Sequence, residues 1–313
     1  MSVSPRRRVL FYRKYDQYSG GQQKVFDYFT HFLQHEGWEP SIYWHPESVD
    51  VSDTIWAEHH HLVVSSPNPD ACDLLFLAGM DWQFVVSYQR LLPPVINLIQ
   101  HVRHADPSAD VFPFLVNEAL RICVAPEVKS AIDATGRVVG ETVVIENGIE
   151  LSKFQALGDC GPPCDFYILG NKQPDLAHKL ASRLSNRGYS VRSHLDHEAQ
   201  HHVWQAMSSA GVAIVLPHET EGFYLPALEA MALSKVVVVP DCVGNRAFCR
   251  HGYNCIMPAL DLAALETAAL DASDALDSAK GLYLQKNAKK TLEHFTLQRE
   301  REAFHQLLAS LEI

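Results

Sequence analysis

The residues with the clearest chemical potential are two glutamates, Glu221 and Glu229, which flank the expected start of a helix. Pro226 suits the first turn of that helix, where its missing N–H costs no hydrogen bond. Residues 222–225 then form a turn whose backbone N–H groups lie at the positive end of the helix dipole. Gly222 permits close approach of a ligand to that backbone. The segment therefore predicts a diphosphate site with a carboxylate on each side.

Each carboxylate has a role that its position suggests. A carboxylate that accepts hydrogen bonds from two neighbouring hydroxyl groups is a common way to hold a ribose, and Glu229, near the end of the first helical turn, suits it. Glu221 lies in the loop before the helix and suits acceptance from other ligand hydroxyls. Taken singly, each glutamate is explained by the preference of acidic side chains for helix N-termini. Their combination with the glycine turn favours a ligand site.

Alternating strands and helices supply the framework for this turn. Short apolar runs are bounded by turn formers, and helical periodicity fills the intervals. We expect strands at 9–12, 74–78, 95–99, 121–125, 143–145, 166–169, 189–193, 212–216 and 236–239. We expect helices at 22–35, 176–186 and 199–209, from about 226, and through the tail beyond 260. This pattern predicts an α/β fold of parallel sheets covered on both faces.

The chain of 313 residues is long enough for two domains. The turn-rich stretch 158–163 interrupts the alternation and is predicted to link them. We therefore expect two Rossmann-like, doubly wound domains facing a cleft, with the boundary after residue 158. In open parallel sheets, ligands bind outside the carboxyl ends of the strands, so the loops after strands are the places where site residues are expected.

Composition excludes some classes of function. The net charge of -11 argues against a general nucleic-acid binder, because phosphate contacts need a basic face. No apolar run is long enough to cross a bilayer or to serve as a signal peptide. The seven irregularly spaced cysteines suit free thiols in a reducing cytosol. We expect a cytoplasmic protein; Arg6, Arg7 and Arg8, either solvated or touching anionic lipid, leave peripheral contact with the inner face of the membrane open.

Residues 221–232 resemble the signature of the retaining GT-B glycosyltransferases of family 4, the glycosyl transferases of group 1. That signature has two glutamates separated by seven residues, with Gly-Phe after the first and Leu-Glu-Ala-Met-Ala around the second. Here these elements are Glu221, Gly222 and Phe223, followed by residues 228–232 around Glu229. The resemblance covers the C-terminal half closely and the N-terminal half at scattered anchors, including the Asn-Gly-Ile stretch within 145–154.

Further site roles are implied by the resemblance alone. Gly20 and Gly21 lie where the family often carries two glycines near the donor phosphate or the acceptor. His101 lies where many members place a histidine near the reacting sugar, and Asn245 where a loop approaches the donor sugar. The family's usual Arg and Lys after the first strand of the C-terminal domain are reduced to Lys172, which remains a candidate cation for the diphosphate.

One departure falls inside the signature itself. Tyr224 replaces the glycine that usually follows Gly-Phe, and its side chain is expected to reshape the sugar pocket. The resemblance still implies that Phe223, Tyr224 and Leu225 border the donor with Gly222 and Glu229. Residues 159–290 would form the nucleotide-sugar-binding domain, and residues 291–313 a helix that packs back on the N-terminal, acceptor-side domain.

The activity implied by the resemblance is retaining transfer of a sugar from a nucleotide-diphosphate sugar to a glycan or lipid-linked acceptor. Glu221, His101 and Lys172 would act at the reacting groups. Analogy with short members of the family points to surface polysaccharide synthesis. Two alternatives remain: a GT-B-like sugar-nucleotide binding protein without turnover, and a sugar-nucleotide epimerase or phosphorylase.

No metal ion or other cofactor is expected. The chain contains no Asp-x-Asp pair that could bridge a diphosphate to a metal. His197 and His201 match the His-Glu-x-x-His motif of zinc hydrolases. No third ligand follows them at a typical spacing, so a zinc site is a minor alternative.

Overall fold

The structure, a computed structural model, describes residues 6–85, 92–158 and 160–311. The chain forms two compact units, which are described separately: unit 1 is Met1–Asn147 with Arg299–Ile313, and unit 2 is Gly148–Gln298. The sequence-based divisions were placed after residues 158 and 290, and the stretch 158–163 belongs to unit 2. Asp159, inside the predicted linker, lies outside the described residues.

Unit 1 contains a parallel six-stranded sheet in the order β2-β1-β3-β4-β5-β6. Its strands are β1 (Arg7–Arg13), β2 (Trp38–Trp44), β3 (Leu74–Ala78), β4 (Val95–Ile99), β5 (Leu120–Cys123) and β6 (Thr142–Val144). Its α-helices are α1 (Gly20–Leu33), α2 (Trp82–Val85), α3 (Pro126–Asp133) and, from the end of the chain, α10 (Leu297–Ser310). The strand order reverses between β1 and β3, which is the switch point of this sheet.

Both faces of the unit 1 sheet are buried, as is typical of parallel sheets. On one face, Phe11 of β1 stacks on Phe76 of β3 and meets Phe29 of α1 edge to face. On the other face, the preceding residue of β1, Leu10, joins a cluster with Leu75. The alternation follows from the two-residue period of a strand, and it explains why these strands are apolar throughout.

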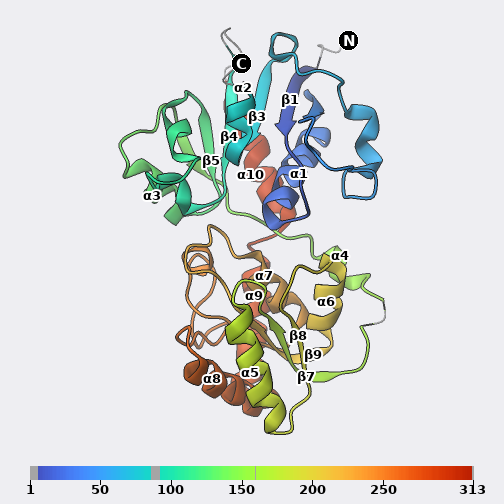
Figure 1. The fold of residues 1–313 in the computed structure, drawn as a ribbon, viewed down its shortest axis with the longest axis vertical. Helices are drawn as coiled ribbons and strands as arrows, with labels where there is room; N and C mark the ends of the chain where they lie inside the picture. The colour runs from blue at the N-terminus through green and yellow to red at the C-terminus, as the bar shows by residue number, and fades with distance from the viewer. Residues whose placement is uncertain (1–5, 86–91, 159, 312–313) are drawn as a thin grey trace. The chain divides into compact units, whose positions relative to one another are not determined.

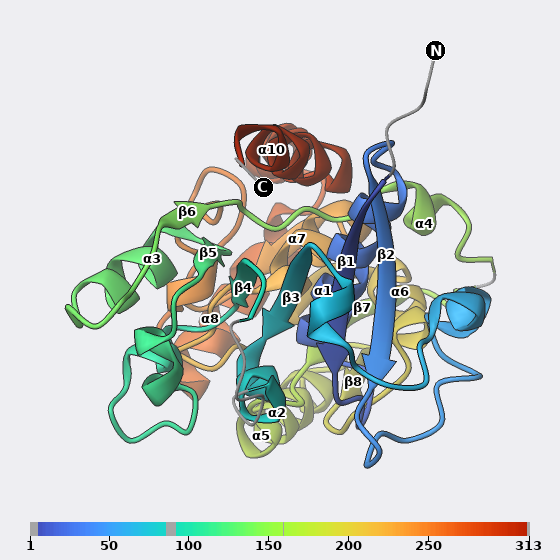
Figure 2. The same ribbon diagram turned by 90° about the horizontal axis from the view of Figure 1, so that it is seen from above.

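The last helix packs on α1 within unit 1. Phe304 of α10 lies edge to face with Tyr28, at a centroid distance of 4.9 Å. The buried Lys24 of α1 places its Nζ 2.5 Å from Glu300 of α10 and 2.7 Å from Asp27. Two carboxylates thus offset the cost of burying the ammonium group. Figure 1 and Figure 2 show α10, in red, as part of this unit, which confirms the predicted return of the C-terminal helix.

Unit 2 contains a parallel four-stranded sheet in the order β10-β9-β7-β8. Its strands are β7 (Cys164–Leu169), β8 (Val191–His194), β9 (Ala210–Val215) and β10 (Val236–Val238). Its α-helices are α4 (Ser152–Gln155), α5 (Pro174–Asn186), α6 (Gln200–Ser208), α7 (Leu225–Leu233), α8 (Leu262–Ala275) and α9 (Ala279–Leu292). The order reverses between β7 and β9, so this unit also has a switch point.

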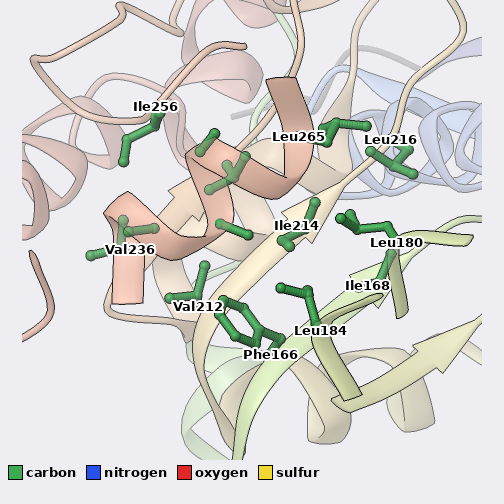
Figure 3. Packing of buried hydrophobic residues seen from close by; sticks show 14 of the residues in the cluster. Phe166, Ile168, Leu180, Leu184, Val212, Ile214, Leu216, Val236, Ile256 and Leu265 are labelled. Atoms are coloured by element: carbon green, nitrogen blue, oxygen red, sulfur yellow. The ribbon is translucent and has the colours of Figure 1, made fainter. Parts of the chain in front are cut away.

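One face of the unit 2 sheet is covered by the apolar sides of α5 and α8. Figure 3 shows Phe166 and Ile168 of β7 and Ile214 of β9 packed with Leu180 of α5 and Leu265 of α8. All five side chains are fully buried. The predicted α/β fold with two doubly wound parallel sheets is therefore confirmed. Within the described residues, no helix combines the length and the apolar character that a membrane span requires.

Gly148 has a structural reason to be glycine. The chain at Ile149 pairs with Thr296 through two backbone hydrogen bonds, from Ile149 N to Phe295 O and from Leu297 N to Ile149 O. A Cβ on residue 148 would lie 2.2 Å from the Thr296 carbonyl oxygen. The close approach of these two backbones requires a residue without a side chain.

Gly148→Ala is expected to lower the free energy of unfolding by about 2 kcal/mol, because the backbone contact must open to admit the methyl group. Urea denaturation measures this change. Gly21→Ala is the matched control, since its Cβ would meet only the side chains of Gln100 and Ser19, at 3.5 Å or more, and its free energy of unfolding should stay within about 0.5 kcal/mol of the native value. Equal stability of the two variants would contradict the explanation.

Candidate functional site

Two loops lie at the switch point of unit 2, where open parallel sheets commonly bind ligands. The loop after β7 carries Lys172, and the loop after β9 carries Glu221. The Gln173 side chain ties the loops together by donating from Nε2 to the Pro217 carbonyl at 3.2 Å. Lys172 Nζ lies 3.8 Å from Glu221 Oε1. The topology thus brings together two residues that were predicted for the site from distant positions in the sequence.

The loop before α7 is held by the loop after β10. Val243 N donates to the Glu219 carbonyl at 3.0 Å, and Tyr224 N donates to the Gly244 carbonyl at 2.8 Å. A Cβ on residue 244 would lie 2.7 Å from Phe223 N, so only glycine allows the two backbones to approach this closely. Gly244 therefore determines the position of the loop that carries Glu221.

Asn245 stabilises the loop that carries Gly244. Its side chain is fully buried and uses both polar groups within its own loop. The Oδ1 atom accepts from Cys242 N at 3.2 Å, and Nδ2 donates to the Pro240 carbonyl at 2.9 Å. This geometry gives Asn245 a positioning role through Gly244.

The amino end of α7 provides free backbone donors. Within the described part of the chain, the N–H groups of Gly222 and Phe223 have no hydrogen-bond acceptor, although both residues are buried. Tyr224 N donates to Gly244, and Leu225 N donates to the Phe223 carbonyl at 3.1 Å. Two of the four expected donors are therefore available. Buried N–H groups are rarely left unpaired, and at a helix N-terminus they form an anion site.

Phe223 also anchors the loop to the core. Its ring packs against Phe248 at a centroid distance of 5.2 Å and against Phe295 at 6.1 Å. The side chain thus points into an aromatic cluster, while its backbone N–H remains available. Phe223 can therefore contribute its backbone N–H to an anion site although its side chain is apolar.

Glu229 lies on α7 and is buried. Its Oε1 accepts a hydrogen bond from Gln200 Nε2 of α6 at 3.1 Å. Burial raises the pKa of Glu229 to about 7, against the opposing effects of the Trp204 indole, the Gln200 amide and the positive charge of Lys153. The Trp204 N–H forms no hydrogen bond of normal geometry. The carboxyl group therefore changes its charge near neutral pH, and it has capacity for further hydrogen-bond donors.

Tyr224 has a buried hydroxyl group without a hydrogen-bond partner in the described chain. Burial raises its pKa well above the ordinary value, and the negative charges of Glu221 and Glu229 contribute in the same direction. By contrast, the buried Tyr167 hydroxyl is 3.0 Å from His194 Nδ1. An unpaired buried hydroxyl typically costs about 1–3 kcal/mol. Such a group beside two carboxylates is a candidate for ligand contact.

The remaining predicted site residues belong to unit 1. Gly20 and Gly21 form the first turn of α1, which Ser19 caps by accepting from Gln22 N at 3.2 Å. The loop after β4 reaches this turn, because Gln100 Nε2 donates to the Gly21 carbonyl at 3.2 Å. His101 follows in that loop, and its Nδ1 accepts from Arg103 N at 3.0 Å. Unit 1 therefore brings the glycine pair and the His101 loop together.

An ion pair at the switch point of unit 1 was not predicted from the sequence. Arg13 ends β1, and Asp81 follows β3 closely. Arg13 Nη1 lies 2.9 Å from Asp81 Oδ2, and Arg13 Nε donates to the Gln22 side chain at 3.0 Å. Burial raises the pKa of Asp81, and the positive charge of Arg13 opposes that shift. The signal that predicts both residues is their place at the carboxyl ends of neighbouring strands.

The His-Glu-x-x-His match does not form a zinc-protease helix. α6 begins at Gln200, so His197 and Glu198 precede the helix and only His201 lies on it. Among the described residues, no three His, Cys, Asp or Glu side chains come together in a group that could hold a metal ion. The motif therefore lacks the single-helix geometry that places two histidines on one face.

The two doubly wound units with parallel sheets define the GT-B class, and solved structures of similar fold agree. The chain superposes on Anabaena Alr3699/HepE in complex with UDP and glucose with a TM-score of 0.72 at 16% identity, covering 97% of this chain and 100% of that one. A glycosyltransferase from Rickettsia africae ESF-5 gives 0.71 at 13% identity, covering 96% and 97%. Sucrose-phosphate synthase from Thermosynechococcus elongatus gives 0.68 at 13%, covering 98% and 100%.

The sequence of unit 2 gives the family. Residues 149–274 match the family model described as glycosyl transferases group 1. This identifies unit 2 as a group 1 glycosyltransferase domain and confirms the resemblance noted from residues 221–232. A comparison with curated protein sequences found no match. The chain accordingly has the GT-B fold, and its unit 2 carries a group 1 glycosyltransferase domain.

Proposed function

We propose that the protein transfers a sugar, with retention of anomeric configuration, from a nucleotide-diphosphate sugar to a glycan or lipid-linked acceptor. The observation that carries this proposal is the pair of free, buried N–H groups of Gly222 and Phe223 at the start of α7. The donor complexes support it by analogy, since Alr3699/HepE was solved with UDP-glucose.

The chemistry assigns a role to each side chain. Breaking the bond between the anomeric carbon and the phosphate oxygen leaves a diphosphate with additional negative charge. The N–H groups of Gly222 and Phe223 and the ammonium group of Lys172 hold that charge, and one such donor is typically worth about 2.7–4 kcal/mol of barrier. Glu221 accepts from the sugar hydroxyls and stabilises the positive charge that develops on the sugar. Glu229 accepts from the ribose hydroxyls.

The remaining features of the proposal are drawn from the family resemblance. The departing phosphate oxygen takes the proton of the acceptor hydroxyl on the same face of the sugar, which gives retention. Transfer proceeds without a metal ion, since Lys172 and the backbone donors supply the compensating positive charge. Gly20, Gly21 and His101 lie on the acceptor side. The product enters surface polysaccharide synthesis, and a lipid-linked acceptor would be met at the inner face of the membrane.

A thermal-shift panel of nucleotide sugars and free nucleoside diphosphates tests donor binding. A ligand at about a hundred times its Kd should stabilise the protein by about 2.7 kcal/mol. Release of free nucleotide from the stabilising sugar nucleotide then tests turnover. Glu221→Gln should abolish release, whereas Glu219→Gln, which alters an exposed side chain in the same loop, should not.

The outcomes separate the alternatives. Stabilisation together with release that depends on Glu221 supports transfer. Stabilisation without release, with or without candidate acceptors, indicates a binding protein that has lost turnover. Conversion of the donor to an isomeric sugar nucleotide indicates an epimerase. Absence of stabilisation by every nucleotide excludes the proposal.

Tyr224→Phe is expected to raise stability and weaken donor binding. Removing an unpaired buried hydroxyl should increase the free energy of unfolding by about 1 kcal/mol. If that hydroxyl contacts the donor, the Kd should rise roughly 2- to 12-fold, which corresponds to one ordinary hydrogen bond. Tyr167→Phe is the control: its hydroxyl bonds His194, so its loss should lower stability. A destabilised Tyr224→Phe would show that the hydroxyl is satisfied within the protein.

A further inference from the structure

An exposed face of α9 combines lysines with large apolar side chains. At about 100° per residue, Leu282, Tyr283, Lys286, Lys289 and Lys290 fall on one side of the helix, and all five are exposed. Leu282 is 61% exposed, more than any other large apolar side chain in the described residues, and Tyr283 is 51% exposed. Isolated exposed apolar residues are ordinary. Two adjacent ones in the middle of a lysine cluster are not.

The lysines of this face have no acidic partners. Lys286, Lys289 and Lys290 form no ion pair with any described residue. α9 itself contains no aspartate or glutamate, and the exposed Glu293 that follows it forms no ion pair with these lysines, in a chain whose net charge is -11. Several lysines elsewhere in the described chain are paired, including Lys14 with Glu47, Lys129 with Asp133 and Lys235 with Asp277. The helix dipole favours Lys289 and Lys290 in the last turn, but it explains neither Lys286 nor the exposed Leu282 and Tyr283.

A neighbouring loop extends the basic face. Tyr253 lies edge to face with Tyr283 at a centroid distance of 6.1 Å. Asn254 in the same loop donates from Nδ2 to Thr291 Oγ1 of α9 at 2.8 Å, which fixes the loop against the helix. Arg250, four residues earlier, is exposed and has no acidic partner within the described chain. Cationic groups thus surround two tyrosines and a leucine.

We propose that this face of unit 2, formed by α9 and the loop 250–253, docks on an anionic lipid bilayer. Charge complementarity selects the partner, because lysines around exposed aromatic and leucine side chains are the composition of interfacial helices. The lysines meet lipid phosphates while Leu282 and Tyr283 enter the headgroup region. Docking adds a surface to the proposed transferase and does not depend on sugar transfer, so its test needs binding alone.

Co-sedimentation with vesicles tests the proposal on the full chain without nucleotide. The native protein should bind phosphatidylcholine vesicles that contain one-third phosphatidylglycerol, and binding should fall at high salt and without phosphatidylglycerol. The variant Lys286→Gln/Lys289→Gln/Lys290→Gln should bind roughly 100-fold more weakly, since each lysine near an anionic surface contributes about 1 kcal/mol. Leu282→Ser/Tyr283→Ser should also weaken binding.

The matched control removes the same number of charges from paired lysines. Lys14→Gln/Lys129→Gln/Lys235→Gln changes the net charge equally and should bind vesicles like the native protein. Unchanged thermal unfolding of both triple variants excludes misfolding, because every altered side chain is at the surface. Equal weakening by the two triple variants, or no binding by the native protein, overturns the proposal. Binding to double-stranded DNA but not to vesicles would also overturn it in favour of another polyanion.

Discussion

Above neutral pH, Glu229→Gln is expected to be more stable than the native protein by about 3 kcal/mol. The carboxyl group is buried on α7 with one hydrogen bond from Gln200. Its ionised form is poorly solvated there, which is why burial raises its pKa to about 7 from an ordinary 4.5. A glutamine side chain has nearly the same shape and remains neutral at every pH.

The sign of the effect follows from proton binding. Below the ordinary pKa of 4.5, folded and unfolded chains both carry the proton, so the stability from this group is fully present. Between 4.5 and about 7, only the folded chain holds the proton, so stability falls as pH rises. Above about 7 both states are ionised and the loss is complete. The advantage of Glu229→Gln should therefore grow across this window and then stay constant.

Urea denaturation of both proteins at a series of pH values measures this difference. Glu266→Gln provides the opposite case, because hydrogen bonds from Arg183 and Arg187 lower the pKa of Glu266. That variant should gain nothing above neutral pH. A Glu229→Gln advantage that does not vary between acidic and neutral pH would contradict the account.

The affinity for the donor should rise with pH, whereas the stability of the native protein falls. If ribose hydroxyls donate to ionised Glu229, the Kd of the native protein should fall about tenfold from one pH unit below its pKa to one unit above it. Glu229→Gln should lose this pH dependence along with most of its affinity. A variant that is both more stable and less able to bind is typical of a functional residue held in an unfavourable environment.

Much of the fold could be predicted from local sequence patterns. The bounds of β3 and β4 are those expected, because β3 is a continuous apolar run and β4 is a short run in which only Asn97 is polar. β2 was missed because Pro40 interrupts it and its pattern alternates instead of being uniformly apolar. Its place explains both features: β2 is the edge strand of the sheet, with an isolated bridge from Ile42 to Val63 on its outer side, and edge strands tolerate proline.

The site could be predicted in part. The adjacency of Lys172 and Glu221 follows from the rule that ligands bind where strand order reverses. The contacts of Glu229 with Gln200 and Trp204 do not follow from any local pattern, since they depend on how α6 packs on α7. For the same reason the sequence predicted four free N–H groups at the start of α7, whereas those of Tyr224 and Leu225 are occupied. The carbonyl that occupies Tyr224 N belongs to Gly244, in a loop beyond the next strand.

The contact between the Tyr224 N–H and the Gly244 carbonyl predicts a second large mutational effect, that of Gly244→Ala. The added methyl carbon would lie 2.7 Å from Phe223 N and 2.8 Å from the Glu221 carbonyl oxygen. The backbone at Gly244 is not in the left-handed region, so the conflict is one of space alone. Both neighbouring atoms are backbone atoms and cannot rotate away. The loop that carries Glu221 and the free donor of Phe223 must therefore move.

A displacement on the order of 1 Å at a reacting group commonly reduces catalysis about 100-fold. Gly244→Ala should therefore lower kcat/KM for the donor by about two orders of magnitude, beyond what its loss of stability explains. Activity is measured well below the melting temperature, with circular dichroism to verify folding.

Gly211→Ala is the control for an added methyl group elsewhere in unit 2. Its Cβ would meet the end of the flexible Leu276 side chain at 3.0 Å, at the start of β9 and away from the loop before α7. That variant should lose some stability and keep its kcat/KM. Full activity in Gly244→Ala would mean that the position of Phe223 N does not matter for the reaction. The anion site at the start of α7 would then lie outside the catalytic centre, even if nucleotides still bind there.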